Sequence, residues 1–378
     1  MKEMKKIPCV IMRGGTSKGI YIKSNHLPAA QEERDLAVLA IFGSPDVRQI
    51  DGLGGADPLT SKLAIIGPST HADADIDYTF AQVSIDRPVV DYAGNCGNIS
   101  AGVGPFAVDE GFVSAVEPVT SVRIHNTNTG KILIAEVEVA DGRAKVTGDC
   151  KIAGVPGTGS KIMLNFAGTA GSSTGKLLPT GNVVDTITTP SGTIEASIVD
   201  CANPMVFVRA EDMGITGIES PQEIDSNDQL LSRLEEIRSE VAVVIGMAEN
   251  PAMATEKSPA FPMIAMVSKA KEYKDFTTGN TIKAEDVSVV SRLMFMQVLH
   301  KTYAGTGTVC TGAAAKIPGT IVNEMVAEDD SVELVRIGHP AGVISIEAKV
   351  VEGKVERAAF ARTARRILEG SVYVKNEA

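Results

Sequence analysis

The sequence predicts an α+β protein with much antiparallel sheet. Several short segments alternate apolar with polar side chains, as in ILIAEVEVA and GVISIEAKV, and this period of two is typical of half-buried strands. Few segments show the spacing of amphipathic helices, and a weak internal repeat joins the two halves of the chain. The predicted strands include residues 7–12, 19–23, 132–140 and 342–350.

Three segments are predicted to be helical because their apolar residues recur at i, i+3 and i+4. They are residues 31–42, which are followed by Gly43, residues 228–247 and residues 284–302. Two further helices, composed of small residues, are expected to begin at Cys96 and at Cys310. Glycine weakens a helix in water, so such helices suit a position enclosed by sheet.

The internal repeat places the same features in the same order in each half. The first half has GIYI (19–22), KLAII (62–66) and NCGN (95–98), and the second has MVFV (205–208), MIAMV (263–267) and VCTG (309–312). Each half thus reads as two strands followed by a cysteine that opens a small-residue helix. The repeat predicts two similar domains.

A chain of 378 residues fits two domains better than one. The stretch at 154–182 is rich in Gly, Ser and Thr and is typical of a crossing between domains, so the boundary is expected near residue 183. One domain is predicted over 1–183, and the other over 184–361.

Composition excludes several classes of partner. The formal net charge of −11 disfavours nucleic acid and anionic lipid, and the absence of Trp, with only 4% aromatic residues, disfavours base stacking. No apolar segment is long enough to span a membrane, and the apolar run in MKEMKKIPCVIM is too short for a secretory signal. No partner other than a small molecule is indicated, and the oligomeric state is left open, a homo-oligomer included.

The five cysteines, at 9, 96, 150, 201 and 310, are odd in number and include no C-x-x-C pair. Disulfides and structural zinc are therefore not expected, and reduced thiols indicate a cytoplasmic protein. The five histidines, at 26, 71, 125, 300 and 339, show no metal-ligand spacing, and no metal site is predicted. The loop RGGTSKG (13–19) lacks the P-loop pattern and precedes a strand, so nucleotide binding is rejected.

Cys96 is the strongest candidate for chemistry. It stands in GNCGN at the expected start of a helix, where free N–H groups and the helix dipole favour a thiolate and can hold a substrate carboxylate. The alternative is a small buried apolar side chain, as in most free cysteines. Cys310 has a similar setting, followed by Thr311 and Gly312.

Lys62 ends the glycine-rich stretch DGLGGADPLTSK and precedes an apolar strand. A lysine there is either the solvated end of a strand or a positioned acid or base, and the residues alone favour the solvated end. The loop before residue 19 can bind a carboxylate through its amides and hydroxyls.

Several long motifs in the same order make the sequence similar to the PrpF family of isomerases, within the diaminopimelate-epimerase-like superfamily. The resemblance runs nearly end to end. The motifs are MRGGTSKG (12–19), DGLGGADPLTSK (51–62), GNCGN (94–98), GKLLPTGN (175–182), NP (203–204), HKTYAGTGTVCTGAAAKIPGT (300–320), IGHPAG (337–342) and RTARRI (362–367).

The resemblance implies two similar domains, each a mixed sheet wrapped around a central helix, with the active site in the cleft between them. It also implies that the last strand, within about 362–378, returns to the first domain. Lys62 and Cys96 are implied as the catalytic pair, without a cofactor, and Cys310 as a candidate second acid or base. The resemblance also implies Ser17 as a substrate contact. The expected helix starts after Cys96 and Cys310 add Gly97, Asn98, Thr311 and Gly312 as expected contacts, and Thr16 is a further donor in the loop.

The implied activity is a shift of a C=C bond by 1,3 proton transfer in a small unsaturated dicarboxylate. The expected reaction converts 3-methylitaconate to 2,3-dimethylmaleate, with 2-methylaconitate cis–trans isomerisation and 4-oxalomesaconate tautomerisation as alternatives. Two other classes stay open: a racemase or epimerase that uses Cys96 and Cys310 as opposed acids and bases, and a carboxylate-binding protein without catalysis. Which of Cys96 and Lys62 is the base is also open, although a Cys96 thiolate beside a protonated Lys62 is simpler electrostatically.

Overall fold

The computed structural model describes residues 3–326 and 334–375. They form two compact units, and each is described by itself. Unit 1 comprises residues 3–151, 157–164 and 362–375, and unit 2 comprises 152–156, 165–326 and 334–361. The domain boundary expected near residue 183 stays a prediction. The predicted domains also include residues 1–2, 327–333 and 376–378, which lie outside the described residues.

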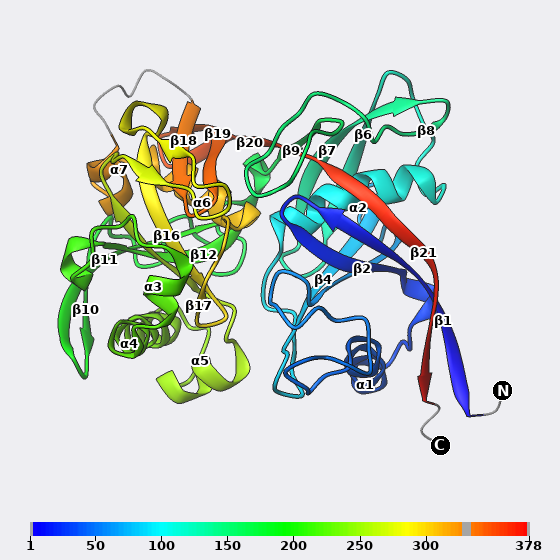
Figure 1. Ribbon diagram of the computed structural model, residues 1–378, viewed down its shortest axis with the longest axis horizontal. Coiled ribbons are helices and arrows are strands. Elements are labelled where there is room, and N and C mark those ends of the chain that lie inside the picture. Colours follow the sequence, from blue (N-terminus) through cyan, green and yellow to red (C-terminus); the bar gives the residue numbers. More distant parts are fainter. Residues whose placement is uncertain (1–2, 327–333, 376–378) are drawn as a thin grey trace. The chain divides into compact units, whose positions relative to one another are not determined.

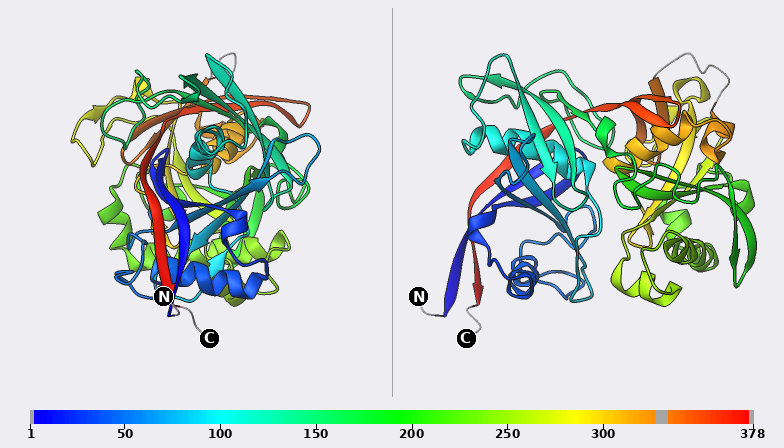
Figure 2. Two further views of the ribbon diagram at one scale, coloured as in Figure 1. Left: turned by 90° about the vertical axis from the view of Figure 1, so that its right-hand side faces the viewer. Right: turned by 180° about the vertical axis from the view of Figure 1, so that it is seen from behind.

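Unit 1 is a mixed sheet that surrounds one helix, α2 (Gly97–Asp109) (Figure 1). The order of its main strands is β21, β1, β2, β3, β4, β6 and β7, and β21 runs antiparallel beside β1, as both views of Figure 2 also show. A second helix, α1 (Gln31–Phe42), packs outside the sheet. The strands of unit 1 are β1 (Met4–Gly14), β2 (Ser17–Lys23), β3 (Lys62–Pro68), β4 (Ile76–Val83), β5 (Val90–Asp91), β6 (Val119–Asn126), β7 (Lys131–Ala140), β8 (Arg143–Ala144), β9 (Ile162–Asn165, which reaches into unit 2) and β21 (Ala364–Lys375).

Unit 2 has the same arrangement around α6 (Gly305–Ala315), which contacts β11, β12, β18 and β19. Its other helices are α3 (Pro221–Asp225), α4 (Asp228–Val244), α5 (Pro251–Lys257) and α7 (Ile321–Met325). Its strands are β10 (Asp185–Thr189), β11 (Gly192–Cys201), β12 (Asn203–Arg209), β13 (Met263–Ser268), β14 (Tyr273–Lys274), β15 (Thr281–Ile282), β16 (Val289–Phe295), β17 (Val298–Leu299), β18 (Leu334–His339), β19 (Gly342–Val351) and β20 (Lys354–Arg362, whose last residue belongs to unit 1). Short 3-10 turns lie at Ser24–His26, Ala167–Thr169, Glu211–Met213 and Ala284–Asp286.

The strand pairings confirm the strand portion of the internal repeat. From β1 to β7 the successive pairs β1–β2, β2–β3, β3–β4, β4–β6 and β6–β7 are antiparallel, parallel, antiparallel, parallel and antiparallel. The pairs β11–β12, β12–β13, β13–β16, β16–β18 and β18–β19 follow the same alternation. In each unit the central helix lies in the chain between the two strands of the second parallel pair.

The small residues of α2 allow this close enclosure. Every residue from Gly97 to Val108 is buried. A Cβ on Gly102 would lie 2.3 Å from the hydroxyl of Tyr21, so only glycine lets β2 approach the helix at this point. The sequence correctly predicts this enclosed helix.

The helix predicted over residues 284–302 is wrong. The segment contains a 3-10 turn, β16 and β17, and Met296 and Gln297 form the turn between the strands with positive φ angles of 55° and 59°. All residues of β16 are buried between β13 and β18. A strand buried on both faces is apolar along its whole length, so some of its side chains match a helical spacing by coincidence.

The other two amphipathic helices are confirmed, α1 with the predicted bounds and α4 with an earlier end at Val244. In the described part of the chain, no helix is both long and apolar enough to cross a membrane.

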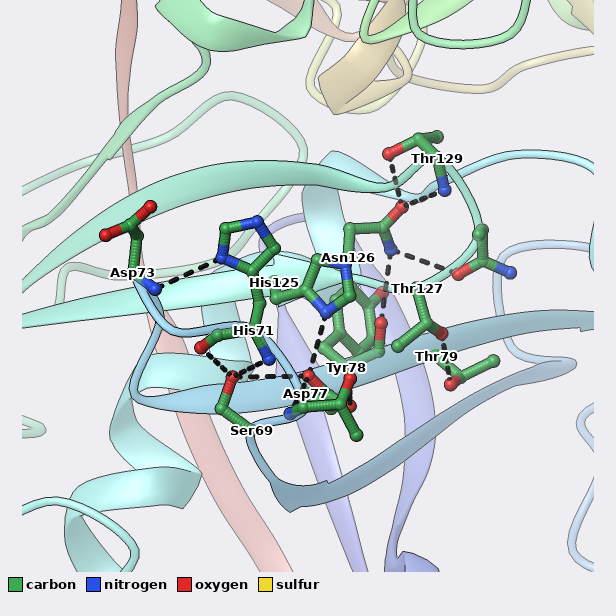
Figure 3. A network of polar contacts seen from close by, with 12 residues as sticks. Ser69, His71, Asp73, Asp77, Tyr78, Thr79, His125, Asn126, Thr127 and Thr129 are labelled. Carbon is green, nitrogen blue, oxygen red and sulfur yellow. Dashed lines mark hydrogen bonds and ion pairs between the residues drawn. The ribbon is translucent and has the colours of Figure 1, made fainter.

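A polar network joins the start of β4 to β6 in unit 1 (Figure 3). The Asp77 carboxylate accepts hydrogen bonds from the Thr70 amide at 3.1 Å and the Thr70 hydroxyl at 2.8 Å, and it lies 2.8 Å from Nδ1 of His125. The rings of His71 and His125 are 5.2 Å apart. Burial raises the pKa of Asp77, but the hydrogen bonds from His125 and Thr70 outweigh it and hold the pKa below its usual range.

Asp77→Asn is expected to lower the free energy of unfolding by about 1 kcal/mol at pH 7, because charge-assisted hydrogen bonds are lost. A carboxyl group whose pKa is lower in the folded state stabilises the fold above its unfolded pKa of about 4, and this stability is lost as pH falls through the folded pKa. Urea unfolding should show a smaller difference in the free energy of unfolding between the wild type and Asp77→Asn at pH 3 than at pH 7. Asp73→Asn, on the exposed side of the network, is the control and should change little.

Candidate active site

Lys62 and Ser17 are the first residues of two neighbouring parallel strands. Lys62 begins β3 and is paired with Gly19 of β2. A Cβ on Gly19 would lie 2.9 Å from the Lys62 carbonyl oxygen, so glycine allows this close approach. The structure therefore places Lys62 inside the unit and rules out the alternative of a solvated strand end.

The Lys62 side chain is only 2% exposed. Its Nζ donates a hydrogen bond of 2.6 Å to Oε1 of Gln82 and lies 5.4 Å from the centre of the Phe80 ring. Burial lowers the pKa of Lys62 below its ordinary value, and the negative charges of a Cys96 thiolate and of Asp57 oppose this by raising it. Cys96 is thus close enough for a thiolate there to act on the charge of Lys62.

Cys96 is the N-cap residue of α2, with an extended backbone (φ −117°, ψ 103°). Its amide donates to Oδ1 of Asn95 at 2.7 Å, and its carbonyl accepts from the amide of Ser100 at 2.8 Å and from the Ser100 hydroxyl at 2.9 Å. The first amides of a helix lack intrahelical acceptors and carry partial positive charge. The predicted helix start at Cys96 is confirmed, and the thiol lies at the end that favours negative charge.

Two tyrosines lie near Cys96 in the core of unit 1. Tyr21 donates its hydroxyl hydrogen to the Ile99 carbonyl at 2.6 Å, and both Tyr21 and Tyr78 are fully buried. Burial, reinforced by the charge of a Cys96 thiolate, raises the pKa of each phenol well above its ordinary value. Both phenols therefore stay neutral at physiological pH.

Ser17 is 2% exposed, and its hydroxyl has no hydrogen-bond partner within residues 3–326 and 334–375. A buried hydroxyl without a partner costs free energy, so it marks a position where a substrate oxygen is expected. The neighbouring amide of Thr16 donates to Oδ1 of Asn98 at 3.4 Å. Asn98 follows Gly97 in the first turn of α2.

Arg362 was not identified from the sequence as a site residue. It is 4% exposed, and its Nε donates to Oδ1 of Asn98 at 3.0 Å. Burial lowers the pKa of Arg362 to about 9, against the raising effect of Cys150 and Cys96 thiolates, so the guanidinium stays charged at pH 7. The only available signal was its place at the start of RTARRI. Gln82 was also missed, although a polar residue inside the apolar strand FAQV was a usable signal.

The expected helix start at Cys310 is wrong, because α6 begins at Gly305 with Ala304 at the N-cap. Cys310 lies within the helix, fully buried, and its thiol donates to the Val199 carbonyl at 3.2 Å. Burial raises the pKa of Cys310 well above its ordinary value. The run GTGT offers no conventional capping residue, so the sequence pattern did not locate the start.

Thr311 and Gly312 therefore do not lie in the first turn of a helix. The Thr311 hydroxyl is 2.9 Å from that of Tyr303, and a Cβ on Gly312 would lie 2.7 Å from the Ile346 side chain. Both residues pack within unit 2, and their predicted substrate contacts stay predictions. Across the described ranges, no group of three or more His, Cys, Asp or Glu side chains is placed to hold a metal ion.

Comparison with known proteins identifies relatives over the whole length. The chain is 67% identical to 3-methylitaconate isomerase of Eubacterium barkeri, over 99% of each chain, and 39% identical to 2-methyl-aconitate isomerase of Shewanella oneidensis, over 98% of this chain and 97% of the relative. A crystal structure of methylitaconate-delta-isomerase, 67% identical in sequence, superimposes with a TM-score of 0.81 and covers 99% of this chain and 96% of that one. The family model described as PrpF protein matches residues 4–375, and the chain belongs to the PrpF family.

Proposed function

We propose that this protein is an isomerase that shifts a C=C bond by 1,3 proton transfer in a small unsaturated dicarboxylate, converting 3-methylitaconate to 2,3-dimethylmaleate without a cofactor. The observation that carries the proposal is the pairing of a buried lysine, Lys62, with a cysteine at a helix N-terminus, Cys96. The 67% identity to a 3-methylitaconate isomerase supports this substrate over the two alternatives in the family.

The reaction needs one proton removed and one returned two carbons away. A base takes the proton from the carbon that carries both a methyl group and a carboxylate. The electron pair spreads over the allyl system and that carboxylate, and an acid then protonates the terminal methylene to give the second methyl group. Passage of a proton from the base to the acid, directly or through water, then restores both side chains, and no oxidant or reductant is required.

The main energetic difficulty is charge, because a dianion becomes more negative in the transition state. Fixed donors aimed at the carboxylates stabilise such charge strongly when water is excluded. The first amides of α2, at Gly97 and Asn98, and the buried Ser17 hydroxyl are proposed for this task, with the Arg362 guanidinium adding positive charge.

We assign the Cys96 thiolate as the base and the Lys62 ammonium as the acid. An ammonium beside a thiolate stabilises both charges, and the helix N-terminus adds to the stabilisation. Because burial lowers the pKa of Lys62, the ammonium releases its proton more readily than an exposed lysine would. The five free cysteines support a reducing compartment, the cytoplasm, as the place of action.

The racemase alternative needs two opposed thiols. In unit 2 the residue at the N-cap of the central helix, where unit 1 has Cys96, is Ala304. Cys310, buried within α6 with a raised pKa, is poorly suited to accept a proton. These observations support the lysine–cysteine pair over a two-cysteine mechanism.

Incubation of the purified protein with 3-methylitaconate, 2-methylaconitate and 4-oxalomesaconate, followed by NMR, tests the proposal. We expect turnover of 3-methylitaconate at the highest kcat/KM, unaffected by EDTA. In D₂O, deuterium should enter the new methyl group. A substrate proton carried by the Lys62 ammonium would mix with two other exchangeable protons, so less of it should reach the product than if a thiol carried it. Stereoinversion of an amino or hydroxy acid would support the racemase, and tight dicarboxylate binding without turnover would support a binding protein.

A further inference from the structure

Gln82 accepts a hydrogen bond from the Lys62 ammonium and helps to direct this side chain. It lies directly opposite Lys62 in the antiparallel pair β3–β4, and both residues are almost completely buried, at 1% and 2% exposure. The Nζ–Oε1 distance of 2.6 Å is that of a strong hydrogen bond. Neighbours across a sheet have side chains on the same face, so the pairing register itself produces this contact.

The orientation of the Gln82 amide is fixed by its other end. Nε2 donates to the Pro58 carbonyl at 3.2 Å and to the Ser61 carbonyl at 3.1 Å. Carbonyls only accept and a lysine ammonium only donates, so a flipped amide would lose all three hydrogen bonds. The oxygen must therefore face Lys62.

The acceptor is neutral, which matters for a group that must exchange protons. A glutamate in the same place would form a buried ion pair and hold the proton on Lys62, because a nearby opposite charge favours the charged form. Charged groups that act on Lys62 include a thiolate at Cys96, at the start of α2, and Asp57 in the preceding loop. Asp91 of β5 lies opposite Gln82 in the sheet, and its Oδ1 accepts the Ala93 amide.

We propose that Gln82 is a positioning residue for the proton transfer: its oxygen fixes the direction of the Lys62 amino group without adding a charge that would retain the proton. This inference rests on the proposed function of Lys62 as an acid or base.

Two substitutions separate the orientation of the Lys62 amino group from the charge placed beside it. Gln82→Met keeps the size but removes the acceptor, and we expect kcat to fall by roughly 10-fold or more, with KM changed less than about 3-fold, because the proton-transfer geometry is lost. Gln82→Glu keeps the acceptor but adds a negative charge. We expect the midpoint of the Lys62 titration to move up by roughly one pH unit or more, and kcat at pH 7 to fall by roughly 10-fold.

The titration is measured by NMR of protein labelled with ¹³C at the lysine Cε, with the Lys62 signal identified by its absence in Lys62→Met. This readout needs no substrate. If the wild-type protein converts none of the three acids, the proposed function fails, while the titration still tests whether Gln82 controls the charge of Lys62.

Gln49→Glu is the matched control. Gln49 is also 1% exposed and holds the same loop, its Oε1 accepting from the Ser61 hydroxyl at 2.7 Å and the Ala56 amide at 2.8 Å. This variant should leave the Lys62 titration unmoved. The inference is overturned if Gln82→Glu leaves the titration and kcat as in the wild type, if Gln49→Glu moves them equally, or if Gln82→Met loses kcat only in proportion to its unfolded fraction.

Discussion

Lys62→Met is expected to lower kcat by about 10²–10⁴-fold, because a side chain that transfers a proton contributes a factor of this size. Methionine keeps much of the length of the lysine stem in its buried position over Phe80 but removes the exchangeable proton and the charge. Steady-state kinetics on 3-methylitaconate, with kcat and KM determined separately, measure the effect. A near-normal kcat with a raised KM would show that Lys62 only binds a carboxylate.

The stability of the Lys62→Met variant should not fall together with its activity. Because burial lowers the pKa of Lys62, the unfolded chain binds more protons between the two pKa values, and the fold gains stability as pH rises through that range. At pH values below that range, the folded state carries the free-energy cost of a buried charge, and methionine removes this cost. Urea unfolding at pH 7 should therefore show no loss of stability.

Lys23→Met provides a matched control in the same unit. Lys23 ends β2 and is paired with Glu110 at 2.9 Å, with 31% of its side chain exposed. Its loss should leave kcat unchanged and cost little stability, since partly exposed ion pairs contribute at most about 1 kcal/mol. A fall in kcat equal to that of Lys62→Met would indicate a general effect of losing charge.

Much of the fold could be predicted because local patterns match the environment of each element. The alternating run of β7 has one buried face, and the small residues of α2 are enclosed on all sides. The pattern failed for β16, which is buried on both faces and so carries no period of its own. It failed again at α6, where a glycine- and threonine-rich start gave no capping signal and Cys310 was taken for the first residue.

For the candidate site, the residues alone indicated Cys96, which precedes a small-residue helix. Around Lys62 they favoured a solvated strand end, and only the family resemblance implied a catalytic role. For Gln82 and Arg362 the sequence offered only weak signals, a polar residue in FAQV and the start of RTARRI, because their contacts depend on partners 20 and 264 residues away in the chain. Those contacts follow from sheet register and from the path of the last strands, which a local pattern does not determine.

Cys96→Ala is expected to abolish measurable turnover while leaving unit 1 folded. The side chain is 9% exposed at the start of α2, and alanine removes the thiol while the backbone hydrogen bonds of Cys96 to Asn95 and Ser100 remain. Circular dichroism and thermal unfolding should therefore resemble those of the wild type. NMR in D₂O would also show whether the variant retains partial exchange at the substrate carbon through Lys62 alone.

Cys310→Ala is the comparison that separates the two mechanisms. Because Cys310 is fully buried within α6 and its thiol donates to Val199, its loss should cost roughly 1 kcal/mol of stability and little kcat. Equal and total losses of activity in both variants would favour two opposed thiols instead. The expected result is thus a crossed pattern, with activity lost at Cys96 and stability lost at Cys310.

Alkylation tests the same assignment without a mutation. Iodoacetamide should inactivate the enzyme, and a dicarboxylate inhibitor should slow inactivation by covering Cys96. Cys150 is partly exposed and will also react, so the sites must be mapped by mass spectrometry or the test repeated in Cys150→Ala. Full activity after confirmed alkylation of Cys96 would exclude it as a base, because a thioether cannot take up the substrate proton, and the transfer would then have to pass through Lys62 and a group other than this thiol.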